Sequence, residues 1–244
     1  MMLEGKRVLV TASAGGGIGF ATARRCAEEG AVVILSDIHE RRLSEAAERL
    51  APVMGATPQT VICNVTDQGQ VDRLFEVAGD IDVLVNNAGL GGTAELVEMT
   101  DEAWTRVLDV SLTGTMRCMR AALQTMIPRG SGVIVNNASV LGWRAQRGQS
   151  HYAAAKAGVM ALTRCAALEA AEAGVRINAV APSLAMHPYL HKVTTPDLLE
   201  KLTQREAFGR AAQPVEIANV ILFLASDLSS YMTGEVISVS SQRA

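Results

Sequence analysis

Two residues four positions apart, Tyr152 and Lys156, form the pattern in this chain that most directly suggests chemistry. They lie in an alanine-rich segment, HYAAAK, that is typical of a helix, so their side chains project from the same helical face. An ammonium beside a phenol favours the phenolate, and we expect it to lower the pKa of Tyr152 from its reference of about 10 toward neutral pH. Tyr152 would then exchange a proton with a substrate. The alternative is that both side chains decorate the surface of an amphipathic helix, so the choice depends on the rest of the chain.

A glycine-rich turn near the N-terminus is the second pattern with chemical meaning. The segment TASAGGGIGF places Gly15, Gly17 and Gly19 between an apolar strand-like run and a helix-like run. Glycines at such a turn let the backbone approach a pyrophosphate closely, and the N-terminus of the following helix supplies amide donors and a positive dipole end. Because the turn opens the first strand–helix unit of the chain, it predicts a nucleotide site.

An acidic residue at the end of the second predicted strand bears on which dinucleotide binds. Asp37 stands eighteen residues beyond Gly19. A carboxylate at that position accepts hydrogen bonds from the adenosine ribose hydroxyls and repels a 2′-phosphate, which favours NAD. Arg41 and Arg42 follow closely. They either lie in solvent on the next helix or accommodate that phosphate, so NADP stays open.

The elements that must position these residues alternate regularly along the chain. Short, mostly continuous apolar runs are typical of strands covered on both faces, and they span residues 7–11, 32–36, 60–64, 82–86, 132–137, 175–180 and 235–240. Helical periodicity separates them over residues 18–29, 39–50, 67–77, 101–127, 150–172, 196–206 and 214–226. This alternation predicts an α/β fold, a Rossmann-type doubly wound parallel sheet of about seven strands with helices on both faces. We expect residues 1–244 to form a single domain, with 182–210 as a substrate-binding loop or lid, or as an ordinary surface connection.

Composition narrows the class of protein. The chain has 244 residues, of which 49% are hydrophobic and 19% charged, and its formal net charge is −3. This balance is typical of a soluble globular protein and offers no basic excess for nucleic acid or an anionic membrane. Four widely spaced cysteines, without a CxxC motif or a histidine at ligand spacing, predict reduced thiols and no metal site. The lack of a signal-peptide pattern and of a bilayer-length apolar run predicts a cytoplasmic protein.

Several motifs, in order along the chain, resemble those of the short-chain dehydrogenase/reductase family in its main branch. They are the glycine turn from Thr11 to Gly19, the NNAG sequence at 86–89, Ser139 in NNASVLG, and the spacing of Tyr152 and Lys156. The resemblance covers essentially the whole chain. It implies a central strand order of 3-2-1-4-5-6-7 and an NAD(P) site at the carboxyl ends of the strands.

The same resemblance implies an NAD(P)-dependent oxidoreductase that interconverts a secondary alcohol and a ketone. Tyr152 would exchange a proton with the substrate oxygen while hydride moves between the carbinol carbon and the nicotinamide. Lys156 would hold the nicotinamide ribose hydroxyls and favour the phenolate, and Ser139 would orient the substrate oxygen. The cofactor-binding residues carried over from the family are Thr11, Ser13, Gly15, Gly17, Ile18, Gly19, Asp37, Asn64, Val65, Asn87, Ala88, Gly89, Tyr152, Lys156, Pro182 and Ala185.

The chain departs from the family pattern in both parts of the predicted nucleotide site. Ala12 stands where the family carries the first glycine of its turn, which leaves the path of the phosphate loop open. Asn64 and Val65 replace an Asp-Val pair that reads the adenine. Because an amide bonds through either of its ends, we expect Asn64 to keep the adenine contact.

Two further departures lie near the predicted catalytic residues. Ser111 occupies the place of an asparagine that disturbs the helix at 101–127 and anchors a water leading to the lysine. Serine can bond back to the carbonyl four residues earlier and lacks the paired donor and acceptor of an amide, so Ser111 is a fourth candidate catalytic residue with a rebuilt or slower proton relay. After Pro182 the family's glycine is Ser183, and His187 stands where a threonine bonds the carboxamide. Backbone groups near Ala185 would meet the carboxamide, whereas His187 either covers the nicotinamide or is an exposed loop residue.

A closer resemblance, to a subgroup of the family, bears on the identity of the substrate. The segments AGGGIG, SDIHERRL and APSLAMHPYL resemble actinobacterial enzymes often named 3-oxoacyl carrier reductases, some of which are associated with degradation of steroid ring remnants as coenzyme A thioesters. This implies a hydroxyacyl-CoA or ketoacyl-CoA substrate of lipid or steroid breakdown, with Trp143 and Gln149 as candidates for its pocket. A polyol, sugar or steroid alcohol, and a non-catalytic NAD-binding sensor, are the alternatives. The apolar surplus of helices 101–127 and 150–172 predicts pairing into a homotetramer or homodimer, as in relatives.

Overall fold

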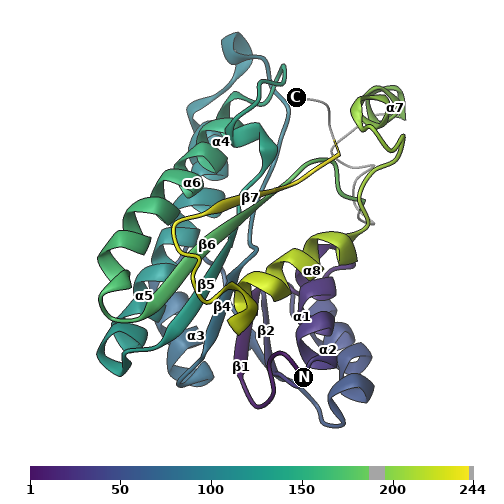
Figure 1. Cartoon of the computed structure of the whole chain (residues 1–244). Coiled ribbons are helices and arrows are strands. Elements are labelled where there is room, and N and C mark those ends of the chain that lie inside the picture. The colour runs from purple at the N-terminus through teal and green to yellow at the C-terminus, as the bar shows by residue number, and fades with distance from the viewer. Residues whose placement is uncertain (187–195, 242–244) are drawn as a thin grey trace.

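A computed structural model of the chain describes residues 1–186 and 196–241. Within these residues, one sheet of seven strands forms the centre of the molecule, in the order β3-β2-β1-β4-β5-β6-β7 (Figure 1). Neighbouring strands pair in parallel throughout. The strands are β1 (Arg7–Thr11), β2 (Val32–Asp37), β3 (Gln59–Ile62), β4 (Val83–Asn86), β5 (Gly132–Asn137), β6 (Val175–Pro182) and β7 (Val236–Val239). The predicted doubly wound α/β sheet and its strand order are confirmed.

Helices cover both faces of the sheet (Figure 1). Those of one face are α1 (Ile18–Glu28), α2 (Glu40–Met54) and α8 (Pro214–Ala225). Those of the other face are α3 (Gln68–Ala78), α5 (Gly114–Arg129) and α6 (Ser150–Ala171). The central strands are continuously apolar because both faces are covered. In β1, for example, Val8 and Val10 enter the core beneath α1 and α8, whereas Leu9 enters the opposite core.

The long helix predicted at 101–127 is not continuous. It consists of α4 (Asp101–Leu108), a π-helical segment (Asp109–Thr113) and α5, which begins at Gly114. Ser111 lies at the middle of the π-helical segment and is fully buried. Local π-helical turns accommodate an extra residue per turn and recur at functional sites. Helical periodicity predicted a single helix, which the π-helical segment interrupts at Ser111, a residue whose hydroxyl bonds the backbone of Leu90.

Helix α2 also differs from its predicted range, which ended at residue 50. The helix continues to Met54 although Pro52 lies in its last turn, and Gly55 follows in the left-handed conformation with φ 69°. A proline near a helix end removes only one backbone donor, whereas glycine at the position after the helix adopts positive φ without steric cost. The glycine therefore marks the end of α2.

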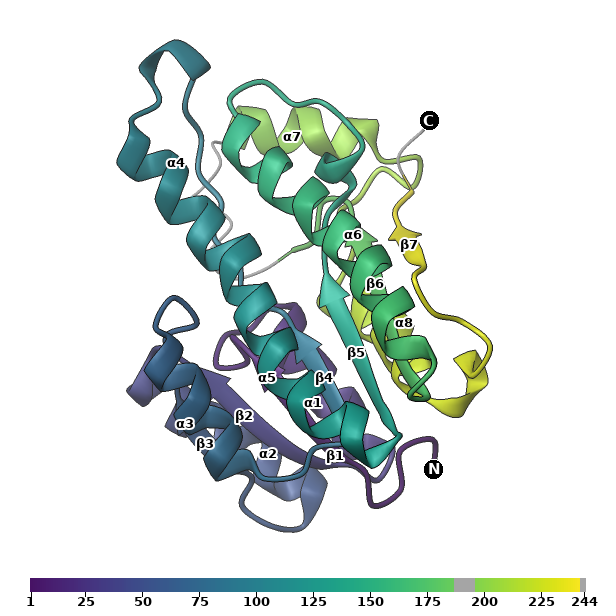
Figure 2. The ribbon, with the colours of Figure 1, turned by 90° about the vertical axis from the view of Figure 1, so that its left-hand side faces the viewer.

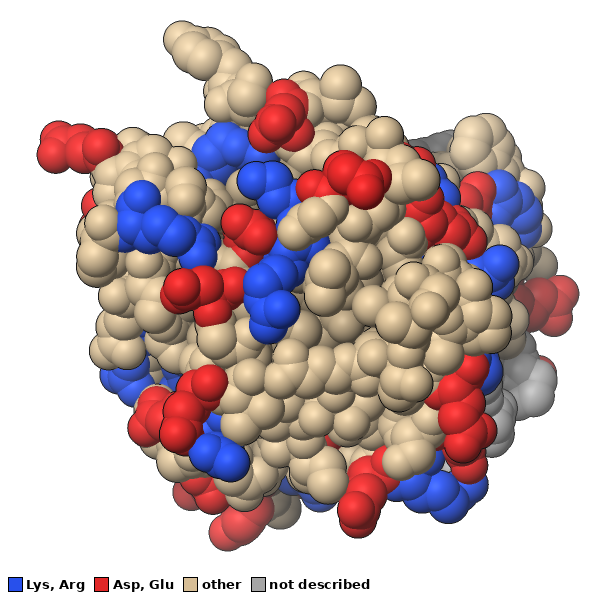
Figure 3. Space-filling view, turned by 90° about the horizontal axis from the view of Figure 1, so that it is seen from below, with Lys and Arg blue, Asp and Glu red and all other residues tan. Residues whose placement is uncertain are grey.

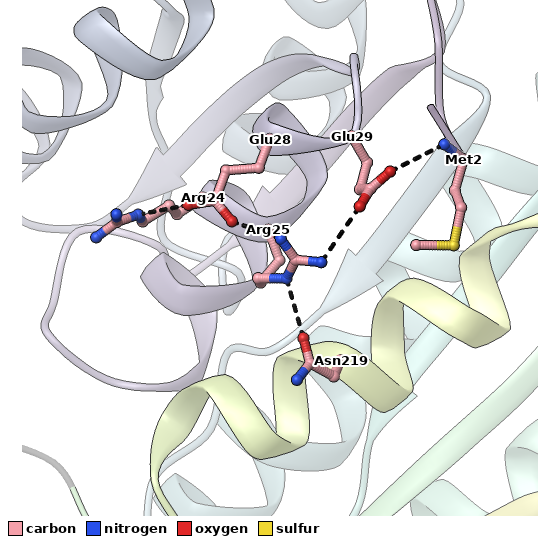
Figure 4. A network of polar contacts seen from close by, with 6 residues as sticks. All are labelled: Met2, Arg24, Arg25, Glu28, Glu29 and Asn219. Carbon is pink, nitrogen blue, oxygen red and sulfur yellow. Dashed lines mark hydrogen bonds and ion pairs between the residues drawn. The ribbon is translucent and has the colours of Figure 1, made fainter.

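A polar network joins the N-terminus to α1 and α8 (Figure 4). The Arg25 Nε–H donates to Asn219 Oδ1 of α8 at 2.9 Å, and its guanidinium pairs with Glu28 and Glu29 of α1. The backbone N–H of Met2 donates to Glu29 Oε2 at 3.1 Å. These contacts hold together the helices that support the glycine turn.

The molecular surface seen from below, in Figure 3, is the end that carries the amino ends of the strands. Blue and red side chains are interspersed there around a broad uncharged area. Opposite charges therefore compensate one another on this end of the molecule.

The chain after β6 returns toward the start of α8. β6 extends to Pro182, two residues beyond its predicted end. Beyond it, the Ala212 N–H donates to Leu184 O and the Met186 N–H donates to Ala212 O, both at 2.8 Å. Helix α7 (Pro196–Arg205) follows. His187 falls outside the described residues, so its role stays a prediction. None of the described helices has the length and apolar composition needed to cross a bilayer.

Candidate active site

A cleft of about 1150 Å³ lies along the carboxyl ends of the strands. Figure 2 shows α4 and α7 rising on either side of this end of the sheet. Because all strands of a parallel sheet end at the same edge, residues that are distant in sequence meet there. The predicted site residues that line the cleft are Thr11, Gly15, Gly17, Ile18, Gly19, Asp37, Asn64, Val65, Asn87, Ala88, Gly89, Ser139, Tyr152, Lys156, Pro182 and Ala185.

The turn after β1 is held by the asparagine of NNAG. Asn87 Nδ2–H donates to Thr11 O at 3.2 Å and to Ala12 O at 3.0 Å, while Thr11 Oγ1 accepts from the N–H groups of Asn87 and Ala88. Ala12 has φ 49°, the only positive φ of a non-glycine residue in the described parts of the chain. A Cβ on Gly19 would lie 2.4 Å from Ala12 O and 2.5 Å from Asn87 Nδ2, so this packing requires glycine. Ala12 thus adopts the left-handed turn without the family's glycine.

The N-terminus of α1 suits a pyrophosphate. The helix begins after Gly17, and no side chain caps its first turn. The first backbone N–H groups of a helix lack partners within the helix, and together with the dipole they bind anions. Gly15, Gly17 and Ile18 line the cleft at this point. The residues present therefore fit the phosphates of a dinucleotide.

Asp37 lies at the end of β2 and faces the glycine turn. Its Oδ2 accepts from the Ala14 N–H at 3.1 Å. Burial raises the pKa of the Asp37 carboxyl, and the Ala14 N–H bond and the positive charge of Arg42 oppose this. Arg42 lines the cleft, whereas Arg41 pairs with Glu45 on the exposed side of α2. Of the two arginines, only Arg42 is therefore placed to act on the part of the cleft that contains Asp37.

Asn64 and Val65, which follow β3, also line the cleft. The Asn64 Oδ1 accepts from the Thr66 N–H at 3.1 Å and from the Thr66 hydroxyl at 2.9 Å, so its side-chain oxygen is already used within the turn that follows β3. Val65 packs against Gly114, where a Cβ would lie 2.6 Å from Val65 Cγ2. The glycine that starts α5 thus lets this helix approach the wall of the cleft.

Ser139, Tyr152 and Lys156 meet at the other end of the cleft. Ser139 is hydrogen-bonded to the Tyr152 hydroxyl. Lys156 is 3% exposed, its Nζ donates to Asn137 O at 2.6 Å, and it lies 5.6 Å from the centroid of the Tyr152 ring. The helical spacing of Tyr152 and Lys156 therefore brings an amine, a phenol and the Ser139 hydroxyl into one pocket.

The expected direction of the Tyr152 pKa is wrong for this structure. Burial raises the pKa of Tyr152, and the hydrogen bond with Ser139 lowers it. Burial also lowers the pKa of Lys156 to about 8. The physical reason is that both groups lose hydration in the same pocket, and for Tyr152 this effect outweighs the hydrogen bond from Ser139, while the Lys156 ammonium points to the Asn137 carbonyl.

The hydroxyl of Ser111 is hydrogen-bonded to a neighbouring loop. The Ser111 Oγ accepts from the Leu90 N–H at 2.9 Å and donates to Leu90 O at 3.0 Å. The bond back to the carbonyl four residues earlier, which the sequence allowed, is not the one it makes. A Cβ on Gly89 would lie 3.4 Å from Lys156 Nζ and 3.8 Å from Ser111 Oγ. Ser111 and Lys156 therefore flank the Gly89 backbone, although Ser111 does not line the cleft.

Two further predicted residues lie away from the cleft. The buried Ser13 hydroxyl donates to Ser36 O at 3.2 Å and accepts from the Ser36 N–H at 3.1 Å, so its side chain contributes to the fold and does not line the site. Trp143 is 51% exposed and does not line the cleft. Gln149 does line it, and its Nε2–H donates to Gly92 O at 2.7 Å.

Other lining residues were not predicted, among them Asn137 and Leu141, whereas Met186 and Leu202 lie within the range 182–210 that the sequence predicted as a substrate-binding loop. Asn137 ends β5 beside the end of β4. Its place at a strand end was a usable signal, because such positions meet the nucleotide in doubly wound sheets. Leu202 was covered only by the range predicted for the substrate loop, because which residue of α7 reaches the cleft depends on the course of the folded chain.

The described residues contain no group of three or more His, Cys, Asp or Glu side chains placed to hold a metal ion. At one end of the cleft, a turn and a helix N-terminus suit the phosphates of a dinucleotide. At the other end, a hydroxyl, a phenol and an amine are suited to orient and protonate a substrate oxygen. Fold and site together define a dinucleotide-dependent oxidoreductase.

Comparison with known proteins identifies the family. The profile described as "Enoyl-(Acyl carrier protein) reductase" matches residues 12–241. The chain is 61% identical to a "(5R,7aS)-5-hydroxy-7a-methyl-1-oxo-2,3,5,6,7,7a-hexahydro-1H-indene-carboxyl-CoA reductase" of Mycobacterium tuberculosis, over 99% of this chain and 94% of the relative. It is 42% identical to a 3-oxoacyl-[acyl-carrier-protein] reductase of Thermotoga maritima, over 98% of both chains. The crystal structure of a short chain dehydrogenase from Mycobacterium smegmatis has a TM-score of 0.87 and 59% identity, covering 100% of this chain and 95% of the other.

The chain belongs to the short-chain dehydrogenase/reductase family. It is an NAD(P)-dependent oxidoreductase that interconverts a secondary alcohol and a ketone, as the sequence motifs predicted.

Proposed function

We propose that the protein interconverts an alcohol and a ketone on the coenzyme A thioester of a fused-ring carboxylic acid, with NAD as its cofactor. The observation that carries the reaction is the meeting of Ser139, Tyr152 and Lys156 in the cleft that also contains the glycine turn. A bound dinucleotide would supply or accept the hydride. Side chains of the protein carry out every other step of the proposed reaction.

Each of the three residues has one role in this proposal. Ser139 turns its hydroxyl from the Tyr152 phenol to the substrate oxygen, donates a hydrogen bond to it and orients it. Tyr152 gives its proton to the oxygen during reduction and takes it back during oxidation. Lys156 turns from the Asn137 carbonyl toward the ribose hydroxyls and the phenol, where its charge favours the phenolate. Ser111 supports the site by holding the Leu90 backbone beside Lys156.

Asp37 is the basis for preferring NAD over NADP. Its carboxylate ends β2 at the cleft and would accept hydrogen bonds from ribose hydroxyls, whereas a 2′-phosphate would meet a like charge. Arg42 also lines the cleft and could offset that charge. The carboxylate is fixed by the Ala14 N–H, so it stays directed into the site whichever dinucleotide approaches. Charge repulsion from Asp37 should therefore weaken the binding of NADP and leave the binding of NAD unaffected.

The substrate class rests on the relative with 61% identity, whose name specifies a hydroxylated, methylated indene ring joined to coenzyme A. The cleft is compatible with a ring system of this kind, because the apolar side chains of Leu90, Leu141, Met186 and Leu202 are among those that line it. A 3-oxoacyl thioester is the second candidate, supported by the relative with 42% identity. Polyols, sugars and free steroid alcohols lack the acyl carrier that each relative's name includes, coenzyme A in one and acyl carrier protein in the other.

The test follows NADH and NADPH absorbance with matched substrates. The set comprises a bicyclic keto-acid coenzyme A thioester, a linear 3-oxoacyl-CoA, and the free bicyclic keto acid. We expect the highest kcat/KM with the bicyclic thioester and NADH, and we expect Tyr152→Phe to lower kcat by at least about 100-fold, the usual contribution of general acid–base catalysis. Turnover by Tyr152→Phe equal to that of the parent would contradict the catalytic assignment. Equal turnover of the free acid would contradict the thioester.

We further propose a homotetramer, or a homodimer, that works in the cytoplasm. Support for assembly comes from α5 and α6, where a hollow of about 490 Å³ is lined by Met116, Leu123 and Leu162 among others, and Leu168 is 79% exposed. Apolar surface of this kind is typical of an interface between chains. Cytoplasmic location is supported by the free cysteines at 26, 63, 118 and 165, since disulfides are rare in a reducing compartment.

A further inference from the structure

Two pairs of asparagines bridge β4 and β5 where these strands end. Asn86 Nδ2–H donates to Asn136 Oδ1 at 2.9 Å, and Asn137 Nδ2–H donates to Asn87 Oδ1 at 2.9 Å. Successive side chains along a strand point to opposite faces, so the two pairs lie on opposite sides of the sheet. Chemically identical residues thus occupy two different environments.

The pair of Asn86 and Asn136 belongs to the core. Both residues are almost fully buried, and Asn136 Nδ2–H also donates to Thr163 Oγ1 of α6 at 2.9 Å. Thr163 in turn donates to Val159 O within its own helix. This network fastens α6 to the sheet and does not line the cleft.

The pair of Asn87 and Asn137 lines the cleft. Because the oxygen of the Asn87 amide accepts from Asn137, its NH₂ group must face the other way, where it donates to Thr11 O and Ala12 O. An amide free to rotate by 180° would instead present its oxygen to two carbonyl oxygens. Asn137 therefore selects the orientation in which Asn87 holds the phosphate turn.

The hydrogen bond from Asn87 is needed at this turn because of the backbone conformation of Ala12. Ala12 adopts φ 49°, a conformation that costs free energy for any residue with a Cβ and persists only where its surroundings impose it. Without the bond from Asn87 to Ala12 O, the turn would relax, and a dinucleotide would have to restore its shape on binding.

Asn137 also touches the other end of the site. Its backbone carbonyl accepts from Lys156 Nζ at 2.6 Å. Its own side-chain Oδ1 is buried and has no hydrogen-bond partner among the described residues. A buried acceptor without a partner destabilises a fold, so an apolar side chain would serve the sheet better at this position. The contact that the amide does make is the one to Asn87.

We propose that Asn137 is a positioning residue for the dinucleotide: it orients the Asn87 amide, and through it the left-handed turn at Ala12. The inference rests on the proposed dinucleotide cleft but not on the substrate. It predicts that loss of the Asn137 side-chain donor weakens dinucleotide binding without an equal loss of stability.

The variant Asn137→Val keeps the backbone carbonyl and removes the donor. We expect its Kd for NAD(H), measured by fluorescence titration in the absence of substrate, to rise about three- to ten-fold, the effect of one net hydrogen bond. The KM for the dinucleotide should rise with it, while kcat changes less than two-fold or so because the carbonyl bonded to Lys156 remains. Since an orphaned acceptor is also removed, the thermal midpoint should stay within about 3 °C of the parent, less than the shift that a loss of about 1 kcal/mol produces.

The matched control is Asn136→Val, the same change one residue away on the opposite face. It should lower the thermal midpoint and leave the dinucleotide Kd unchanged, because it breaks only the network to Asn86 and Thr163. If Asn136→Val does not fold, Thr163→Val removes one bond of the same network and serves in its place. A parallel loss of affinity and stability in both variants would show a merely structural role and overturn the proposal.

A double-mutant cycle tests the route through Asn87. If Asn137 acts through that amide, Asn137→Val should have no further effect on the Kd in an Asn87→Ala background. Additive effects would refute the route. If the parent protein itself binds neither NAD(H) nor NADP(H), the proposed function fails, and this inference with it. If the parent binds and Asn137→Val binds equally well, only the inference fails.

Discussion

Replacement of Lys156 by methionine should stabilise the protein while abolishing its activity. Lys156 is 3% exposed, and burial lowers its pKa from 10.5 to about 8. At about 1.36 kcal/mol for each pH unit, this difference means that the folded protein loses about 3 kcal/mol of stability by holding the ammonium at pH 7. The bond from Nζ to Asn137 O returns part of it, about 1 kcal/mol. Methionine retains the apolar stem, so we expect Lys156→Met to raise the free energy of unfolding by about 2 kcal/mol.

The pH dependence of stability shows whether the depressed pKa of Lys156 causes this gain. A lysine with a depressed pKa binds fewer protons in the folded than in the unfolded protein between its two pKa values, so stability rises with pH across that interval. The stability contribution of the neutral Lys156 amine is fully present above 10.5, the pKa of lysine in the unfolded protein. It is lost as pH falls toward about 8, the pKa of Lys156 in the folded protein. The stability gap between Lys156→Met and the parent should therefore be constant below about pH 7.5, shrink from about pH 8 upward and reach zero near about pH 9.5, above which the retained bond from Nζ to Asn137 O leaves the parent slightly more stable.

Urea denaturation followed by far-ultraviolet circular dichroism, at pH 7, 8, 9 and 10 without added dinucleotide, measures the gap directly. The matched control is Lys201→Met, since Lys201 is exposed on α7 and should show no stability gain at any pH. Turnover of Lys156→Met should fall below detection, because the proposed ribose contact and the charge beside Tyr152 are lost. A variant less stable than the parent at pH 7, or a gap that does not change with pH, would refute the assignment of a desolvated ammonium to Lys156.

Two further predictions concern the turn and the assembly. Ala12→Gly should raise the free energy of unfolding by about 0.5 kcal/mol, measured by urea denaturation, since relief of the left-handed φ of 49° outweighs the greater freedom of glycine in the unfolded chain; a loss of stability would mean that Ala12 is unstrained. Sedimentation equilibrium should give the mass of four chains, or of two, and Leu168→Arg, at a side chain 79% exposed on α6, should lower it. A parent mass equal to one chain would contradict the proposed assembly.

Much of the fold followed from patterns along the chain. The strands could be predicted because both faces of a doubly wound sheet are covered, which makes residues such as those of β1 and β4 continuously apolar. The glycine turn could be placed because glycines between a strand and a helix have few other uses. Tyr152 and Lys156 could be paired because helix geometry alone puts residues four apart on one face. Each of these inferences depends on local geometry, which the order of residues carries.

Other features depended on segments that are distant in sequence. The π-helical interruption at Ser111 reflects two bonds to Leu90, twenty-one residues away. The orientation of Asn87 depends on Asn137, fifty residues away. Likewise, the Tyr152 pKa is raised because the surroundings of the phenol remove its hydration. A sequence reports which groups are present and how neighbours along one element are arranged, but desolvation and the choice of hydrogen-bond partner are set by elements that meet only in the folded chain. The sequence by itself therefore determined the fold and the family and singled out the candidate catalytic residues, whereas the tertiary structure decided the burial that shifts their pKa values and the contacts that orient them.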